Sequence, residues 1–387
     1  MKIGIDIRNI GKNRTGDEVV FFNLVKSLRI TNSCEHANDI FYLFTDITDK
    51  NKLEEIGKSL GIEDREDFKI VPLETGNKFT WNFWTLPNHF RKNPIDIYLT
   101  QYITPFFVSK KIKIATIIHD VSFMAYGKYL RFSDLFFLRL LIPISLRRAD
   151  KIIGVSKFTR DEILKYYDIS EKKIGWIHNA VSDNFYREIS VEEIKRVREK
   201  YSLPEKFILY IGTLQPRKNI PNLIRAYSDL PDEIKSAFKL VLAGGKGHNY
   251  DKRIDEEIER YSLENNVMMP GFVDEEDKPA LFKASSLFCN PSFYEGFGIT
   301  ILEAMTLGIP TVASDIPPHR EVAENSILLF SPENPAELSK KISSLLTDSA
   351  LRAGLSEKET AQCQKFSWEK TAEKLRSFFR ASNSAAD

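Results

Sequence analysis

The 387-residue sequence has few cysteines and almost no net charge. Its three cysteines, Cys34, Cys289 and Cys363, lie far apart and are odd in number. They fit neither a disulfide framework nor a metal-ligand spacing, which favours a reducing, cytoplasmic compartment. The net charge is +1, from 55 Lys and Arg against 54 Asp and Glu. This balance excludes a global electrostatic field that would recruit nucleic acid or a membrane.

Long hydrophobic runs are missing as well. The longest apolar stretch, residues 135–146, is interrupted by Arg139 and Pro143 and is too short to span a bilayer. Residues 2–7 have the pattern of a first strand and lack the apolar region of a signal peptide. We therefore expect a cytoplasmic protein whose contact with a membrane is at most peripheral, at the inner face.

Two motifs of nucleotide-binding enzymes are also absent. No G-x-G-x-x-G follows the first strand, which argues against a dinucleotide oxidoreductase. No D-x-D ends a predicted strand, although enzymes that hold a diphosphate through a divalent metal normally need such carboxylates. The acidic run at 274–277 follows a glycine turn and is instead expected to form the first turn of a helix. We therefore expect neither a metal nor another cofactor.

The sequence does contain short β-branched runs that alternate with amphipathic stretches over its whole length. This alternation is typical of parallel sheets built from βαβ units, and 387 residues exceed the size of a typical single core. We expect an α/β protein with two doubly wound, Rossmann-like domains, at residues 1–183 and 184–365. The expected strands are 2–7, 40–44, 68–71, 95–99, 114–118, 151–155, 173–176, 207–211, 238–242, 267–269, 287–290, 311–313 and 327–329.

The most informative segment, residues 290–303, reads N-P-S-F-Y-E-G-F-G-I-T-I-L-E. An apolar run precedes it and an amphipathic stretch begins at Ile299, so strand, glycine turn and helix are expected in that order. The first turn of such a helix favours an anion, and Gly296 and Gly298 let a ligand approach the backbone. Glu295 and Glu303 lie beside this anion site, where carboxylates suit sugar hydroxyls. A phosphate next to sugar hydroxyls indicates a nucleotide sugar. The alternative without a ligand is a turn that carries two surface glutamates.

This segment resembles the E-x7-E signature of family 4 of the retaining glycosyltransferases (glycosyl transferases group 1). The resemblance extends over nearly the whole chain and implies a GT-B fold, in which two Rossmann-like domains face a central cleft. It further implies that the C-terminal helix, 366–382, crosses back to the first domain. In this family Glu295 would orient hydroxyls of the donor sugar and Glu303 would hold the ribose. Similarity to the family also implies that the anomeric configuration is retained.

A second segment, residues 208–219, is a strand followed by Gly212 and a basic pair, Arg217 and Lys218, at the start of a helix. A diphosphate leaving group gains negative charge as the glycosidic bond breaks, so cations aimed at it lower the barrier. Lys218 resembles the lysine that contacts the donor diphosphate in the family, and Arg217 is expected to assist. Thr213 stands where many members have a further arginine. The alternative to a phosphate site is a helix start whose basic residues are simply exposed to solvent.

The remaining segments resemble the family's motifs less closely. Gly244 follows a strand, and Val273 lies in a loop that resembles the one reading the donor base. Gly16 lies in the loop at 9–17, where relatives have more glycines near the diphosphate. His119 ends a strand and matches the family's active-site histidine, although a capping pair with Asp120 explains it equally well. The expected catalytic residues are His119, Arg217, Lys218 and Glu295. The expected donor-binding residues are Gly16, Gly212, Arg217, Lys218, Gly244, Val273, Glu295, Gly296, Phe297, Gly298, Ile299, Thr300 and Glu303.

Fifteen aromatic residues lie between Phe79 and Phe137, and a basic stretch follows them. Aromatic faces stack on sugars or bury lipid tails. Together these segments suggest an acceptor site near an anionic membrane surface, for a lipid-linked saccharide. Aromatic residues in a core, beside a solvated basic helix, explain the pattern at least as well.

The sequence therefore predicts a glycosyltransferase that moves a sugar from a nucleotide-diphosphate donor to a hydroxyl of a saccharide or lipid-linked saccharide. The stretch at 212–219 looks most like that of mannosyltransferases for bacterial surface polysaccharides, including lipopolysaccharide. GDP-mannose is therefore the first donor to consider, and UDP-sugars follow closely. Two alternatives stay open. One is a GT-B nucleotide-sugar epimerase, and the other is a non-catalytic nucleotide-sugar-binding protein.

Overall fold

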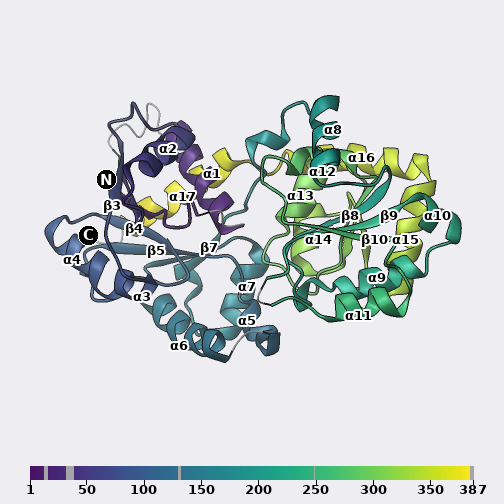
Figure 1. Cartoon of the computed structure of the whole chain (residues 1–387). Helices are drawn as coiled ribbons and strands as arrows, with labels where there is room; N and C mark the ends of the chain where they lie inside the picture. Colours follow the sequence, from purple (N-terminus) through teal and green to yellow (C-terminus); the bar gives the residue numbers. More distant parts are fainter. Residues whose placement is uncertain (13–15, 32–38, 130–131, 248, 384–387) are drawn as a thin grey trace. The chain divides into compact units, whose positions relative to one another are not determined.

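The computed structural model describes residues 1–12, 16–31, 39–129, 132–247 and 249–383, and the chain forms two compact units (Figure 1). The first unit contains Met1–Ala125, Phe132–Asn179 and the segment from Ser367 onward. The second contains Ala180–Phe366 and a short segment that begins at Tyr126. The sequence places the domain boundary between residues 183 and 184, whereas the chain enters the second unit at Ala180.

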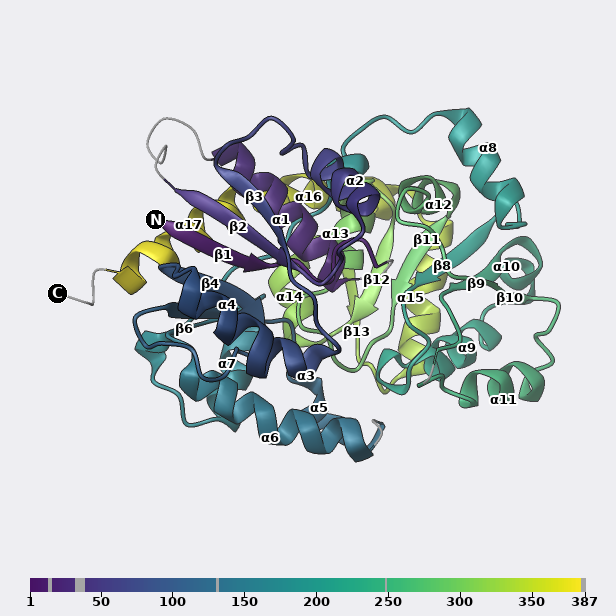
Figure 2. The ribbon, with the colours of Figure 1, turned by 60° about the vertical axis from the view of Figure 1, so that its left-hand side comes forward.

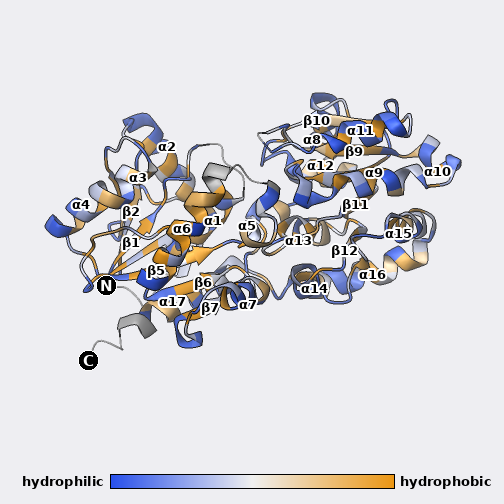
Figure 3. Cartoon of the chain, turned by 90° about the horizontal axis from the view of Figure 1, so that it is seen from below, coloured by the Kyte–Doolittle hydropathy of each residue, from blue (hydrophilic) through white to orange (hydrophobic). Residues whose placement is uncertain are grey.

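The described residues of the first unit form a seven-stranded sheet in the order β3-β2-β1-β4-β5-β6-β7, and all neighbouring strands are parallel. Its strands are β1 (Lys2–Asp6), β2 (Ile40–Thr45), β3 (Phe68–Pro72), β4 (Ile97–Gln101), β5 (Lys113–Ile118), β6 (Lys151–Gly154) and β7 (Ile174–Trp176). All seven were expected, and β4 begins two residues later than predicted. Figure 3 shows the apolar residues of this unit gathered on its strands, as expected for a sheet covered on both faces.

Helices pack on this sheet, and the last helix of the chain is among them (Figure 2). The helices are α1 (Asp17–Thr31), α2 (Lys50–Leu60), α3 (Lys78–Thr80), η1 (Trp81–Thr85), α4 (Leu86–Lys92), α5 (Ser122–Ala125), α6 (Phe132–Arg148), α7 (Lys157–Tyr166), η3 (Glu171–Lys173) and α17 (Trp368–Asn383). Arg376 of α17 donates to the carbonyl of Leu28 in α1 at 2.9 Å and pairs with Asp39 at 3.3 Å. These bonds between residues more than 300 positions apart hold α17 against α1.

The described part of the second unit has a six-stranded parallel sheet in the order β10-β9-β8-β11-β12-β13. Its strands are β8 (Phe207–Ile211), β9 (Lys239–Ala243), β10 (Val267–Gly271), β11 (Leu287–Asn290), β12 (Thr311–Ser314) and β13 (Leu328–Phe330). All six match expected strands. In both sheets the strand order changes direction beside the first strand, which confirms the doubly wound prediction.

The helical segments of this unit are η2 (Gly127–Tyr129), η4 (Asp183–Phe185), α8 (Val191–Lys200), η5 (Pro216–Lys218), α9 (Ile220–Ser228), α10 (Asp232–Ala237), α11 (Arg253–Arg260), α12 (Lys278–Ala284), α13 (Ile299–Thr306), α14 (Pro317–Ala323), α15 (Pro335–Thr347) and α16 (Ser349–Cys363). Within the described chain, no helix is both long enough and apolar enough to cross a membrane.

One expectation about this unit is wrong. The acidic residues 274–277 do not form the first turn of a helix, because α12 begins only at Lys278. Asp277 is fully buried instead and accepts bonds from Arg196 at 2.5 Å and Lys200 at 2.6 Å, both on α8. Those cations come from a separate helix about 80 residues earlier in the chain. The acidic run therefore anchors α8 to the unit.

Candidate functional site

The segment singled out by the sequence forms the predicted strand, turn and helix. β11 ends at Asn290, and α13 begins at Ile299 after a loop. Gly298 precedes the helix with a left-handed φ of 100°, and no side chain of the described residues caps the helix. A Cβ on Gly298 would lie 3.2 Å from the imidazole of His319. Glycine is therefore needed both for its backbone conformation and for this packing. The uncapped first turn leaves its N–H groups available to an anion.

Glu295 is 9% exposed and lies within a set of polar contacts in the loop before α13. One carboxylate oxygen accepts from Lys218 Nζ at 2.5 Å and lies 2.7 Å from the Ser292 hydroxyl. The other oxygen lies 3.4 Å from Arg217 Nη1. Burial alone would raise the pKa of Glu295, but Lys218 and Arg217 outweigh this effect and lower the pKa to about 2. Glu295 is thus a fixed carboxylate that only accepts hydrogen bonds at neutral pH.

The basic pair reaches Glu295 because two loops at the ends of neighbouring strands are tied together. β8 and β11 are adjacent, and the amide of Phe293 donates to the carbonyl of Arg217 at 2.9 Å. Buried Asn219 has a left-handed φ of 59°, and its side-chain amide donates to the carbonyls of Pro291 at 3.0 Å and Pro332 at 2.8 Å. Sequence analysis missed the role of Asn219. Its place after the basic pair was the only local signal.

Glu303, on the second turn of α13, differs from Glu295 in its surroundings. Its side chain is 3% exposed, and its Oε2 has no hydrogen-bond partner among the described residues. Burial raises the pKa of Glu303 to about 7, although the positive charge of Lys278 opposes this shift. A buried carboxyl oxygen without a partner is energetically costly. Such an oxygen is suited to a hydroxyl donor that a ligand brings.

The strand ends show why two of the predicted positions are glycine, Gly244 for its packing and Gly212 for its backbone conformation. A Cβ on Gly244 would lie 1.9 Å from the carbonyl oxygen of Gly212, so no side chain fits there. Gly212 has a φ of 151° and its amide donates to Ala243, while the amide of Gly244 donates to Gly271 at 2.8 Å. These contacts pack the ends of β8, β9 and β10 closely. The predicted donor contacts of Gly212 and Gly244 stay predictions.

The other predicted residues of the second unit occupy the same loops. Val273 is buried in the loop after β10, and Phe297 is buried with its ring 5.8 Å from that of Phe366. Gly296 precedes Phe297 in the loop. Thr300, beside Ile299 in the first turn of α13, accepts from the side chain of Asn290 at 3.2 Å. The structure thus brings Arg217, Lys218 and Glu295 into direct contact and places the others around the start of α13 or at neighbouring strand ends.

A buried histidine under this loop was missed by sequence analysis. His319 of α14 is fully buried, and its Nδ1 lies 2.8 Å from the carbonyl oxygen of Ser314. Because that oxygen only accepts, Nδ1 carries the hydrogen. Burial lowers the pKa of His319 to about 4, against the opposing charge of Glu295. The neutral ring fills the space that the absent side chain of Gly298 leaves.

In the first unit, His119 follows β5 at the carboxyl edge of the sheet, as predicted. Its Nε2 lies 3.0 Å from the side-chain oxygen of Gln101, whose amide nitrogen donates to Asp17 at 3.3 Å. Because the amide oxygen only accepts, Nε2 carries the hydrogen and Nδ1 of the neutral ring is an acceptor. Burial lowers the pKa of His119, opposed by the charges of Asp17 and Asp120. This contact with Gln101 is not the His119–Asp120 capping pair that was the alternative.

Gly16 immediately precedes α1 with a φ of 69°, and its carbonyl accepts from the amide of Val20 at 3.0 Å. A Cβ at this position would meet no atom of the described residues within 4 Å, so among these residues only the backbone conformation favours glycine. Part of the predicted glycine-containing loop, residues 13–15, lies outside the described residues.

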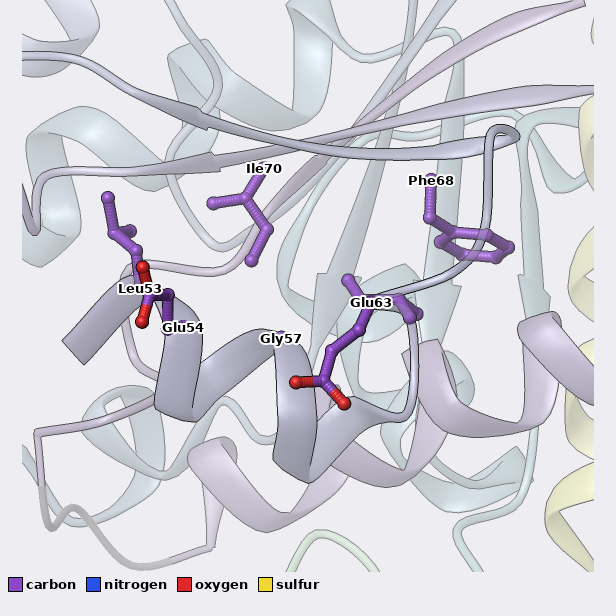
Figure 4. Close-up of a pocket in the computed structure, with 7 residues that line it drawn as sticks. Leu53, Glu54, Gly57, Glu63, Phe68 and Ile70 are labelled. Carbon is purple, nitrogen blue, oxygen red and sulfur yellow. The ribbon is translucent and has the colours of Figure 1, made fainter. Parts of the chain in front are cut away.

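Two further features bear on ligand binding. A shallow pocket lies between α2 and β3, lined by Leu53, Glu54, Gly57, Ile62, Glu63, Phe68 and Ile70 (Figure 4). None of the predicted site residues lines it. Among the described residues, no group of three His, Cys, Asp or Glu side chains is placed to hold a metal ion.

Comparisons with known proteins agree with this architecture. The family description "Glycosyltransferase Family 4" matches residues 18–185, and "Glycosyl transferases group 1" matches residues 191–362. Among solved structures, the sucrose-phosphate synthase of Thermosynechococcus elongatus is similar over 100% of both chains, with a TM-score of 0.76 and 20% identity. The HepE protein of Anabaena, solved with UDP and glucose, is similar over 98% of this chain and 100% of its own, with a TM-score of 0.73 and 18% identity.

Curated relatives are more similar in sequence but only over parts of the chain. The serotype-specific mannosyltransferase WbdA of Escherichia coli is 37% identical over 58% of this chain, a match that spans 28% of WbdA. The O-antigen chain mannosyltransferase B of Escherichia coli is 34% identical over 66% of each chain. The chain thus spans about a quarter to two thirds of the length of these relatives. With both family domains in order on a GT-B fold, this protein belongs to the family 4, group 1 glycosyltransferases.

Proposed function

We propose that this protein transfers mannose from GDP-mannose to a hydroxyl of a saccharide or lipid-linked saccharide, with retention of configuration and without a metal ion. The observation that carries the proposal is the contact of Lys218 and Arg217 with Glu295 beside the uncapped start of α13. It combines two cations for a diphosphate, a fixed acceptor for sugar hydroxyls and a helix terminus that favours anions.

The donor diphosphate would bind at the first turn of α13, where the backbone N–H groups of Ile299 and Thr300 have no partner within the helix. Lys218 and Arg217 would then contact the phosphate oxygens in addition to Glu295. Their charge stabilises the nucleoside diphosphate most when the bond from the sugar C1 to the phosphate oxygen breaks. A divalent metal commonly provides this stabilisation, and here the two side chains and the helix would provide it instead.

The two glutamates would have separate tasks. Glu295, with a pKa of about 2, stays ionised and accepts hydrogen bonds from hydroxyls of the donor sugar. Glu303 has an oxygen without a partner in the described chain, and it would accept from the ribose hydroxyls. His119 of the first unit would bind the donor sugar through Nδ1, the acceptor atom of its neutral ring.

In the reaction the acceptor oxygen would form a bond to C1 on the face from which the diphosphate leaves. The hydroxyl proton would pass to the departing phosphate oxygen, and the bonding electrons of the broken bond would stay with the diphosphate. No side chain of the described site is required to form a covalent bond to the sugar. Attack from the same face accounts for retention.

The choice of mannose is supported by the relatives that are named mannosyltransferases, at 34% to 37% identity. The same relatives support a saccharide acceptor, because one is named for the O-antigen chain. A lipid-linked acceptor would require the first unit to contact a membrane surface. We therefore include peripheral membrane contact, with the enzyme on the cytoplasmic face, in the proposal.

The first test is thermal unfolding with GDP, UDP and ADP at equal concentration, with Mg²⁺ or with EDTA. A nucleotide at 100 times its Kd adds about 2.7 kcal/mol to the free energy of unfolding, enough to rank the bases. We expect the largest stabilisation with GDP, unchanged by EDTA. If no nucleotide stabilises the protein, the donor site is wrong; if UDP or ADP ranks first, GDP-mannose is the wrong donor.

The second test is the reaction itself. With GDP-mannose and a mannose-terminated acceptor, NMR of the product should show the anomeric configuration of the donor. Lys218→Ala should lose most of the activity, whereas Lys252→Ala, an exposed lysine of the same unit, should retain it. Without an acceptor the sugar should be unchanged or slowly released, whereas a changed sugar in the nucleotide product would indicate an epimerase.

A further inference from the structure

The first unit has an unusual set of exposed apolar side chains. Trp84 is 61% exposed and Phe107 is 73% exposed, although large aromatic residues normally bury most of their surface. We define the α6 patch as the large apolar residues of this region that are at least 40% exposed. They are Trp84, Phe107, Phe136, Phe137, Leu140 and Ile144.

The members of the α6 patch on α6 share one face of that helix. Phe136, Leu140 and Ile144 are spaced by four residues, which places them along one side. Phe137 lies beside this row, and its ring is 5.5 Å from that of Phe79 in α3. Figures 1 and 2 both show α3 next to α6.

Aromatic contacts extend the α6 patch from α3 to the loop after β4. Phe83, in η1 directly after α3, stacks on Phe106 with 4.2 Å between ring centroids. The ring of Phe83 also lies 6.2 Å from Phe107 and 5.7 Å from Trp84. The exposed side chains therefore belong to one connected surface. An apolar surface of this kind on a soluble protein marks an interaction site.

Exposed basic residues lie next to members of the α6 patch in the chain. Arg139 is exposed among its members on α6, and the exposed Lys110 and Lys111 follow Phe107 in the loop. Residues 76–150 contain eleven Lys and Arg and only four Asp and Glu, a net charge of +7, and Asp150 pairs with Lys113 at 3.7 Å and with Arg148 at 3.2 Å. Two of those acids have local tasks, since Asp96 accepts from the amide of Lys2 and Asp120 from that of Ser122.

We propose that the α6 patch docks on the surface of an anionic lipid bilayer. Exposed aromatic and aliphatic side chains enter the boundary between headgroups and acyl chains, where tryptophan is favoured. Lysine and arginine beside them attract acidic headgroups. The choice of a bilayer over a protein partner rests on this charge. The docking itself does not depend on the proposed function. Only its biological role, which is to bring a lipid-linked acceptor to the enzyme, rests on that function.

The test uses the full chain with sedimented vesicles of pure phosphatidylcholine and of phosphatidylcholine with about 30% phosphatidylglycerol, whose acidic headgroups supply the negative surface that attracts basic residues. We expect binding to the anionic vesicles that is at least about tenfold tighter than to neutral ones, and that weakens with salt. The fluorescence of Trp84 should shift to shorter wavelength on binding. Trp84→Phe should abolish that shift while leaving binding largely intact.

Two variants distinguish binding through the α6 patch from nonspecific adsorption of the protein to vesicles. Phe107→Ser with Phe136→Ser should weaken vesicle binding about tenfold or more, since each change removes an exposed aromatic anchor. Tyr186→Ser, at an aromatic residue of the second unit that is 57% exposed, should leave binding unchanged. Both proteins should keep the melting temperature of the parent and its stabilisation by GDP.

Several outcomes would overturn the proposal. These are no binding to either vesicle, equal binding to both, or binding that the double variant retains. Light scattering that shows a dimer lost in the double variant, without vesicle binding, would assign the α6 patch to self-association. A protein that is stabilised by GDP but does not bind vesicles would remain a glycosyltransferase without this docking surface. Failure of the docking surface, and with it of the membrane contact in the proposed function, is therefore distinguishable from failure of the donor site.

Discussion

Glu303 should make nucleotide binding release a proton near neutral pH. Burial of its carboxyl group raises its pKa in the ligand-free protein to about 7. One of its oxygens has no hydrogen-bond partner among the described residues. Ribose hydroxyls that donate to this group stabilise its ionised form and lower the pKa. A return to the ordinary value of 4.5 would be a shift of about 2.5 units, or roughly 3 kcal/mol in favour of the ionised form.

The pH dependence follows from this shift. At pH 7 about half of the protein carries a proton on Glu303, so binding should release about 0.5 proton per nucleotide. At pH 6 the release should approach one proton, and the affinity should be about fivefold weaker than at pH 7 because the proton competes with the ribose. At pH 8 both effects should nearly vanish.

Calorimetric titration with GDP in two buffers of different ionisation enthalpy, at pH 6, 7 and 8, measures the released protons directly. The terminal phosphate of GDP itself titrates near pH 6, so the control is Glu303→Gln, which keeps the shape of the side chain but cannot ionise. The difference between the two proteins belongs to Glu303. Proton uptake by the parent protein, or equal release by both proteins, would refute a ribose contact through the carboxylate.

Three further outcomes are expected. Lys218→Ala should lower kcat about 100-fold or more with a smaller change in KM, because Lys218 stabilises charge that develops on the leaving diphosphate. Steady-state kinetics that show an unchanged kcat would contradict this role. Glu359→Gln should stabilise the protein progressively as pH rises from 5 to 8. Burial raises the pKa of Glu359 to about 8, so the native state holds a proton that the unfolded chain has lost above its ordinary pKa of 4.5. The gain in the free energy of unfolding should reach up to about 4 kcal/mol at pH 8, and urea titrations with a pH-independent difference would exclude it. Asp277→Ala should cost about 2 kcal/mol in urea unfolding, because it removes a buried acceptor that Arg196, Lys200 and Tyr201 all bond to. A loss below about 0.5 kcal/mol would mean that α8 is held by its apolar face.

The local elements were largely predictable from the sequence. The strands of both sheets were expected at their observed positions to within two residues, because runs of Val, Ile and Leu between turn residues define buried parallel strands. The start of α13 was also predictable, since Gly298 and the apolar run after it indicate a turn followed by a helix. The candidate glutamates and the basic pair followed from their spacing around this turn.

Contacts between distant segments were not predictable in this way. Asn219 bonds to Pro332, which is 113 residues later, and His319 packs against Gly298, which is 21 residues earlier. The acidic run at 274–277 was misread because its partners are on α8. A pattern within one segment carries no information about which other segment will face it.

Ionisation separates what the sequence determined from what the fold decided. The sequence alone supplied two glutamates eight positions apart, with the same chemistry and the same intrinsic pKa. The tertiary structure placed Lys218 and Arg217 against Glu295 and lowered its pKa to about 2. It buried Glu303, where the positive charge of Lys278 offsets only part of the effect of burial, and so raised the pKa of Glu303 to about 7. The physical reason is that a pKa depends on burial and on nearby charges, and both are set by residues brought together from distant parts of the chain.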